Sequence, residues 1–257
     1  MDTGDVPFVL RAAHYWGHLG NRALAAAEAL DVAHKTGRNE ARTLVRQGEQ
    51  HYAMAIDLRL VSLWLSMPEW FSKHKSYFGA PSAYFRSWRR FIQSSSQSSR
   101  CEFERFVGPS QAVGDIANQH CGLATLHLWS WLMHRATGDR VEAANAIERA
   151  QEERSKSEAL WELSSRPAVR KIRGEGPIKY RLYTAGLSAK IELAKRIHTG
   201  ERPTLSAARA TSTELLEMKR RDLEEELGLR YEVAESRLPD SVNRFVSMVA
   251  EVEELPS

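Results

Sequence analysis

The stretch from Arg22 to His34, RALAAAEALDVAH, decides the fold class of this 257-residue chain. Its apolar side chains recur at every third or fourth position, which is the spacing of one face of an α-helix. Leu24, Ala27 and Leu30 have this spacing, and Val32 follows eight residues after Leu24. Similar spacing continues through most of the chain, whereas the period-two alternation of β-strands is nearly absent. The sequence therefore predicts an all-α protein.

Glycine and proline residues predict where the helices end and begin. Gly37 is the expected stop of a first helix over residues 9–33, and Asn39 is the expected cap of a second helix that runs to residue 65. Pro68 ends that helix or begins the next one. Further helices are expected over residues 110–136, from the Gly138-Asp139 connection to residue 163, and over 178–198, 204–227 and 240–253.

A serine-rich tract, SSSQSS at residues 94–99, is the one low-complexity segment of the chain. Serine-rich segments of this kind behave as flexible linkers. We expect two helical lobes of antiparallel helices, over residues 1–93 and 101–257, joined by a linker over 94–100. With 42% hydrophobic residues, the chain can bury a core as one large domain or as two of ordinary size.

Several classes of protein do not fit the composition. Charged residues interrupt the apolar stretches, so no segment approaches the ~20 apolar residues of a transmembrane helix. The N-terminal residues include Asp2 and Asp5, where a secretory signal would carry lysines. The two cysteines, Cys101 and Cys121, fit reduced thiols better than a disulfide framework. We therefore expect an intracellular protein, cytoplasmic or nuclear, without a signal peptide.

Charge is distributed unevenly over the C-terminal part of the chain. Residues 166–209 carry eleven Lys and Arg against three Glu, and residues 210–257 carry twelve Asp and Glu against six Lys and Arg. The net charge of +3 thus averages a basic block near +8 with an acidic block near −6. A basic block can bind a polyanion, and an adjacent acidic block can compete for it or bind a partner protein. We expect the acidic C-terminal helices to mediate self-association or contact with a protein partner.

Another basic region lies earlier in the chain, where residues 64–91 contain nine of the 22 aromatic residues. Basic residues are interleaved with the aromatic ones: Lys73, Lys75, Arg86, Arg89 and Arg90. Stacking of bases on aromatic rings and pairing of phosphates with Arg and Lys bind single-stranded nucleic acids, and Trp88 is a candidate for stacking. The alternative is that the aromatic residues form the core seam of two short helices: Trp64, Trp70, Tyr84, Phe85, Trp88 and Phe91.

The basic tract over residues 166–181 surrounds a Gly-Glu-Gly-Pro loop. Its cations are Arg166, Arg170, Lys171, Arg173, Lys179 and Arg181. Loops of this composition lie on the surface, where Arg suits bidentate contact with phosphate, and Tyr180 and Tyr183 add surface for stacking. A solvated linker and a nuclear-localisation signal are the alternative interpretations.

The segment Arg46-Gln-Gly-Glu-Gln-His51 offers the sharpest enzymatic hypothesis. An Arg followed by four residues and a His on a long helix resembles the active motif of the helical ribonucleases called HEPN. The resemblance implies that His51 acts as acid and base and that Arg46 stabilises the phosphate in the transition state. The chain departs from the family pattern at Gln47 and at Gly48, which weakens a helix by about 1 kcal/mol relative to Ala.

Histidines are the main candidates for a metal site, and Cys101 or Cys121 could complete a distant one. His14 and His18 are four residues apart and can chelate zinc, but no CxxC or HExxH motif supplies further ligands. His120, His127 and His134 are spaced by seven, which places neighbours about 10 Å apart along a helix and too far apart to share one ion. We therefore expect no metal and no other cofactor.

Together these patterns favour a non-catalytic helical binding protein that engages RNA or another polyanion through its basic and aromatic surfaces. All-α architecture with segregated charge is also what self-assembling nucleoproteins and matrix proteins use, an analogy of physics alone. A HEPN-like ribonuclease and a protein-only scaffold are the alternatives. The same basic residues also suit the headgroups of a membrane surface rich in anionic lipids.

Overall fold

A computed structural model describes residues 5–78, 109–165, 176–227 and 238–255, and these residues form helices and no strands. The all-α prediction is thereby confirmed. In chain order the elements are α1 (Asp5–Glu28), α2 (Lys35–Ser66), α3 (Pro68–His74), the 3₁₀ turn η1 (Lys75–Phe78), α6 (Pro109–Ala136), α7 (Arg140–Ser165), α8 (Gly176–His198), α9 (Leu205–Leu227) and α10 (Leu238–Glu253).

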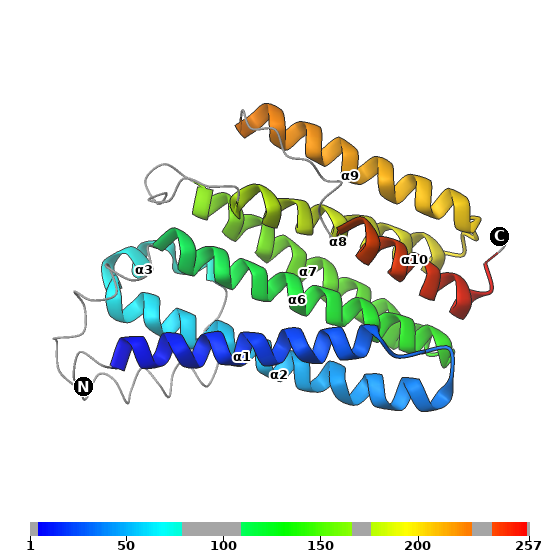
Figure 1. Ribbon diagram of the computed structural model, residues 1–257, viewed down its shortest axis with the longest axis horizontal. Coiled ribbons are helices and arrows are strands. Elements are labelled where there is room, and N and C mark those ends of the chain that lie inside the picture. Colours follow the sequence, from blue (N-terminus) through cyan, green and yellow to red (C-terminus); the bar gives the residue numbers. More distant parts are fainter. Residues whose placement is uncertain (1–4, 79–108, 166–175, 228–237, 256–257) are drawn as a thin grey trace.

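The long helices lie side by side, and successive ones run antiparallel (Figure 1). The hairpin of α1 and α2 packs on α6, which pairs along its length with α7. Helix α8 lies against α6 and α7, and α9 is the outermost helix, in contact with α8 and α10. None of the described helices is long and apolar enough to cross a membrane.

Two apolar clusters hold the bundle together. The first joins α1, α2, α6, α7, α8, α9 and α10, and its largest fully buried side chains include Trp129, Trp131 and Phe245. The second joins the start of α1 and the end of α2 with η1, α6 and the end of α7. Both clusters contain residues from before and after the serine tract. The linker expected over 94–100 lies outside the described residues, and the division into two lobes stays a prediction.

The connection between α1 and α2 differs from the sequence prediction. Helix α1 ends at Glu28, and α2 begins at Lys35, before the expected cap Asn39. Asp31 accepts hydrogen bonds from the Ala33 amide at 2.9 Å and from His34 Nδ1 at 2.6 Å, and this bonding favours a turn over a longer α1. Gly37 lies inside α2 and does not end α1. This position requires glycine because the α1–α2 turn passes close to it: a Cβ on Gly37 would lie 2.0 Å from the Asp31 carbonyl oxygen.

The later helices begin and end within two residues of their predicted bounds. Gly138 follows α6 with a φ of 74°, and Gly200 follows α8 with a φ of 102°. Such left-handed backbone favours glycine and is the usual way in which helices end. Asp139 and Thr204 then cap the next helices, since their side chains accept hydrogen bonds from the amides of Glu142 and Ala207. These local signals made the second half of the chain the easier half to predict.

Candidate functional site

Two of the predicted polyanion-binding side chains are described in full. Lys73, at the end of α3, and Lys75, in η1, are exposed, and neither forms an ion pair with a described residue. Lys179, Tyr180 and Arg181 belong to the first turns of α8. The remaining candidates lie outside the described residues: Arg86, Trp88, Arg89, Arg90, Arg166, Arg170, Lys171 and Arg173.

The described residues that adjoin the two predicted basic regions along the chain lie at the same end of the bundle. Phe78, the last residue of η1, packs in the second apolar cluster together with Leu160 and Leu163 of α7. The tract 166–181 follows α7 directly along the chain. Figure 1 accordingly shows α3, the end of α7 and the start of α8 on one side of the molecule. We call this side, formed by α3, η1, the last turn of α7 and the first turn of α8, the basic end.

The described aromatic residues near the basic end belong to the core. Phe71 and Phe78 are buried and stacked, with ring centroids 5.5 Å apart and planes 9° apart. Trp64 and Trp70 are half-buried and pack against the second cluster. The core interpretation is therefore right for these residues. Tyr183 is half-buried too, and its ring packs against the first cluster.

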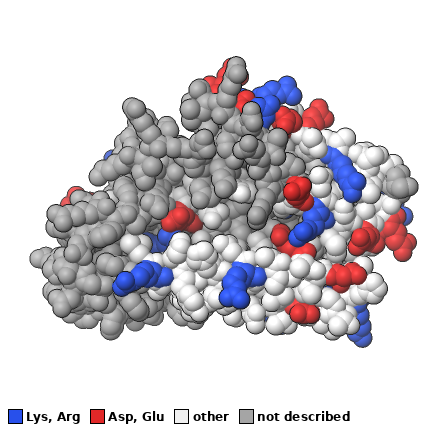
Figure 2. Space-filling view, in the orientation of Figure 1, with Lys and Arg blue, Asp and Glu red and all other residues white. Residues whose placement is uncertain are grey.

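Part of the acidic C-terminal block is neutralised within the chain. Glu253 of α10 accepts two hydrogen bonds from Arg135 of α6, both 2.6 Å long, so it fastens α10 to the bundle. On α9, Arg220 pairs with Glu217 and Glu224 at 2.9 Å. Figure 2 shows cationic and anionic side chains intermingled over the described part of one face. On this face the described residues therefore carry charges of both signs, which are less separated than they are along the sequence.

Arg46 and His51, the candidate ribonuclease pair, are on different sides of α2. Five residues along a helix correspond to a rotation of about 140°. Arg46 is exposed, whereas the ring of His51 lies 5.3 Å from that of Trp16 on α1. Gly48 between them is buried, and a Cβ there would lie 2.7 Å from Leu126 Cδ1, so glycine lets α2 approach α6. Within one chain the structure does not bring the pair together.

The three histidines of α6 each lie beside a carboxylate. Their Nδ1 atoms are 2.5 Å from Glu153, 3.2 Å from Glu49 and 3.5 Å from Asp139, for His120, His127 and His134 respectively. His14 and His18 contact each other through their Nε2 atoms at 3.1 Å. Among the described residues there is no group of three or more side chains that could hold a metal ion.

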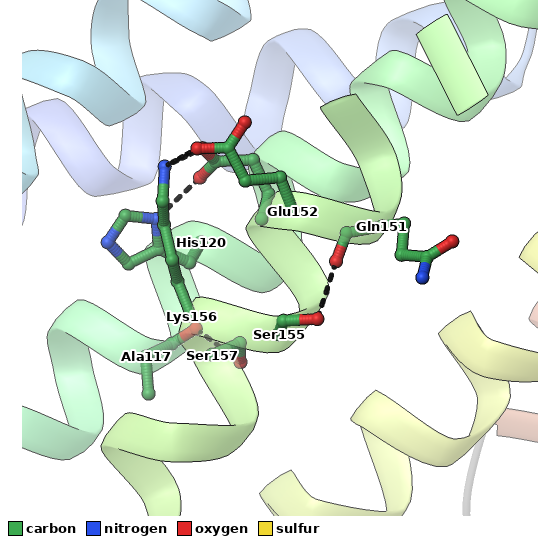
Figure 3. A network of polar contacts seen from close by, with 8 residues as sticks. Ala117, His120, Gln151, Glu152, Ser155, Lys156 and Ser157 are labelled. Carbon is green, nitrogen blue, oxygen red and sulfur yellow. Dashed lines mark hydrogen bonds and ion pairs between the residues drawn. The ribbon is translucent and has the colours of Figure 1, made fainter. Parts of the chain in front are cut away.

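His120 and Glu153 belong to a polar network between α6 and α7 (Figure 3). Lys156 donates to Glu153 and Glu152 at 2.8 Å, and Ser157 donates to the Ala117 carbonyl at 2.8 Å. Burial alone would raise the pKa of Glu153, but the hydrogen bonds and charges of His120 and Lys156 outweigh it and lower the pKa to about 2. Glu153 is therefore held as a carboxylate in a largely buried site.

Sequence reasoning missed a partly open cavity of about 220 Å³ that charged and polar side chains help to line. It lies among α1, α2, α6, α8 and α10. Its wall combines apolar surface with an ammonium, a carboxylate, a thiol, two carboxamides and hydroxyl groups. Lys190 supplies the ammonium, Glu28 the carboxylate, Cys121 the thiol, and Asn21 and Asn118 the carboxamides.

Lys190 of α8 supplies the ammonium. It is only 6% exposed, and its Nζ donates to Ser241 Oγ of α10 at 2.8 Å and lies 5.8 Å from the centre of the Phe245 ring. Burial lowers the pKa of Lys190, and the charge of Glu28 opposes that change in part. No ion pair joins Lys190 to a carboxylate within the described part of the chain.

Tyr52 of α2 closes another side of the cavity and is held by two glycines. A Cβ on Gly20 would lie 2.6 Å from its ring, and one on Gly122 would lie 2.4 Å from it. The Tyr52 hydroxyl donates to Asn21 Oδ1 at 2.8 Å, and burial raises the pKa of Tyr52. Burial also raises the pKa of Cys121 to about 11, so the thiol is neutral at physiological pH.

No protein-family model matches the chain, and no significant similarity was found to a curated protein or to a solved structure. What the chain does is therefore inferred from its own residues.

Proposed function

We propose that the protein is a non-catalytic helical binding protein that engages RNA or another polyanion at the basic end. The observation that carries the proposal is that residues 73–78 and the last turn of α7, which adjoin the two basic regions along the chain, lie at one end of the bundle although they are about ninety residues apart in sequence. Cations that gather on one surface attract a polyanion more strongly than the same cations spread over the molecule. Lys73 and Lys75 are exposed and unpaired among the described residues, as phosphate contacts must be.

The fold adds a reason why the acidic block does not cancel this attraction. Glu217, Glu224 and Glu253 each pair with an arginine of the same chain. Helix α9 is the outermost helix and carries exposed carboxylates at Asp222 and Glu225. In this proposal α9 provides the surface for self-association or for a protein partner, while the basic end binds the polyanion.

Fluorescence anisotropy with a labelled single-stranded RNA, titrated over a range of salt concentrations, tests the proposal. We expect binding that weakens steeply with salt, because each neutralised phosphate releases condensed counterions. In the variant Lys73→Gln/Lys75→Gln, the slope of log K against log salt should fall by about 1.4, the contribution of two contacts to a single strand.

A matched control removes two exposed cations from the opposite end of the bundle, Lys35 and Arg202. The variant Lys35→Gln/Arg202→Gln has the same net charge as the test variant and should keep the wild-type slope. Equal slopes in the two variants would contradict a site at the basic end, and absence of binding at low salt would favour a protein-only scaffold. The RNA is also run on a gel: cleavage that His51→Ala abolishes would replace the proposal with the ribonuclease.

A further inference from the structure

We propose that the cavity among α1, α2, α6, α8 and α10 binds a small amino carboxylate, with its carboxylate on Lys190 and its ammonium on Glu28. This is a second binding site, separate from the basic end. The ligand is a zwitterion of the size of a free amino acid, because the cavity of about 220 Å³ is small. Drug-sized ligands occupy pockets of about 300–1,000 Å³.

The first argument is that two opposite charges line one cavity without pairing. Lys190 and Glu28 are both in its wall, yet no ion pair joins them, and Glu28 makes no hydrogen bond to another described residue. Glu28 is nevertheless near enough for its charge to act on Lys190. A molecule that carries an anionic and a cationic group can lie between them and pair with both.

The second argument is the state of Lys190 without a ligand. An ammonium has three hydrogen-bond donors, and the described structure gives it one acceptor, Ser241 Oγ, and the face of Phe245. A buried cation without an ion-pair partner in contact is costly, and a ligand carboxylate would supply both that partner and the missing acceptors.

The third argument is the chemistry of the remaining wall. The Asn118 side chain makes no hydrogen bond to another described residue, so its amide is available to a polar ligand. Leu24 and Leu187 add apolar surface for an aliphatic part. A wall with one cation and one anion also favours a neutral zwitterion over a simple anion, because Glu28 repels a molecule with negative charge only.

The test compares three probes, L-leucine, L-glutamine and 4-aminobutanoate, each with its N-acetyl derivative and its primary amide. The derivatives remove the ammonium or the carboxylate in turn. We expect at least one free amino acid to raise the Tm of the full chain by about 3–6 °C at ten times its Kd, and its derivatives to have much less effect. Titration calorimetry then gives the Kd.

Two variants locate the site. Lys190→Met should weaken binding of the amino acid at least tenfold. Glu28→Gln should weaken binding of the zwitterion, whereas the affinity for the N-acetyl derivative should stay the same or rise. Lys195→Met, the same change on the same helix but outside the cavity wall, should bind as the wild type does.

Three results would overturn the proposal. The first is no stabilisation by any of the three amino acids, and the second is binding that Lys190→Met leaves intact in a folded variant. The third is an N-acetyl derivative that binds the wild type as tightly as the free amino acid, since Glu28 would then have no part in recognition. Circular dichroism and the Tm of each variant without ligand show whether it is folded.

Discussion

Two buried cations of this bundle have different surroundings. Arg59 of α2 is 5% exposed and lies 2.6 Å from the carboxylate of Asp115 on α6. Lys190 of α8 is equally buried, but its neighbour is a serine hydroxyl, and an open cavity lies where a carboxylate would be expected. Arg59 pairs with a residue of the central helix α6, and α8, which carries Lys190, packs against the same helix.

The difference separates a structural charge from a charge that is available to a ligand. Burial lowers the pKa of Arg59 and raises that of Asp115, and the attraction between the two opposes both changes. Each charge of that pair therefore has its partner within the protein. Lys190 bears the cost of burial without such a partner, which is typical of a group that performs a function rather than one that holds a fold.

The largest effect should follow from breaking the Arg59–Asp115 pair. Asp115→Asn leaves the Arg59 cation buried without a counter-charge, and breaking such a pair costs about 3 kcal/mol of unfolding free energy. Urea denaturation measures it. Glu201→Gln is the control, because the Arg196–Glu201 pair is half exposed and should contribute less than about 1 kcal/mol. If both variants lost the same unfolding free energy, burial would not strengthen the contribution of the Arg59–Asp115 pair.

The stabilisation that the buried carboxylate of Glu153 gains from its partners should depend on pH. The folded-state pKa of Glu153 is lowered from its ordinary 4.5 to about 2, so the folded state favours the charged form. The stabilisation is therefore complete above about pH 5 and is lost as the pH falls towards 2. We expect Glu153→Gln to cost about 2 kcal/mol at neutral pH, with the difference from the wild type shrinking in acid.

The exposed Glu148, on the same helix, provides the control for that experiment. Glu148→Gln should change the unfolding free energy little at any pH, since an exposed carboxylate keeps similar surroundings when the chain unfolds. A Glu153→Gln curve that runs parallel to the wild-type curve from neutral pH into acid would contradict the role given to the network of His120 and Lys156.

The sequence predicted the helices well because their signals are local. Gly138, Gly200 and the caps Asp139 and Thr204 act on neighbouring residues, and the bounds of α6 to α10 follow from them. Gly37 misled, since a glycine within a helix can mark close packing, as Gly48 also does, rather than an end. Only the packed structure tells the two uses apart.

The cavity could not be predicted because its wall comes from five helices. Lys190 counted as one of eleven cations in a basic block. In the structure its ammonium donates to Ser241, fifty-one residues away, and its side chain is buried. One weak signal was present: Lys190 stands between Ala189 and Ile191 in a helix whose apolar residues nearly surround it.

The smallest effect, and the one with the opposite sign, should come from removing the unpaired cation. Lys190→Met keeps the length of the side chain and removes a buried ammonium, so we expect unfolding free energy at neutral pH to rise by about 1 kcal/mol. The pKa of Lys190 is lowered in the folded state, so the wild type gains stability as the pH rises towards 10.5, the ordinary value. The advantage of the variant should shrink over that range.

The same substitution at the paired cation completes the comparison. Arg59→Met leaves Asp115 without its counter-charge and should destabilise the protein by about 3 kcal/mol, whereas Lys190→Met stabilises it. Urea denaturation of both variants at neutral and alkaline pH decides the matter. If Lys190→Met were as destabilising as Arg59→Met, Lys190 would be a structural charge that Glu28 stabilises from a distance. The argument that Lys190 lacks a partner and binds a ligand carboxylate would then be wrong.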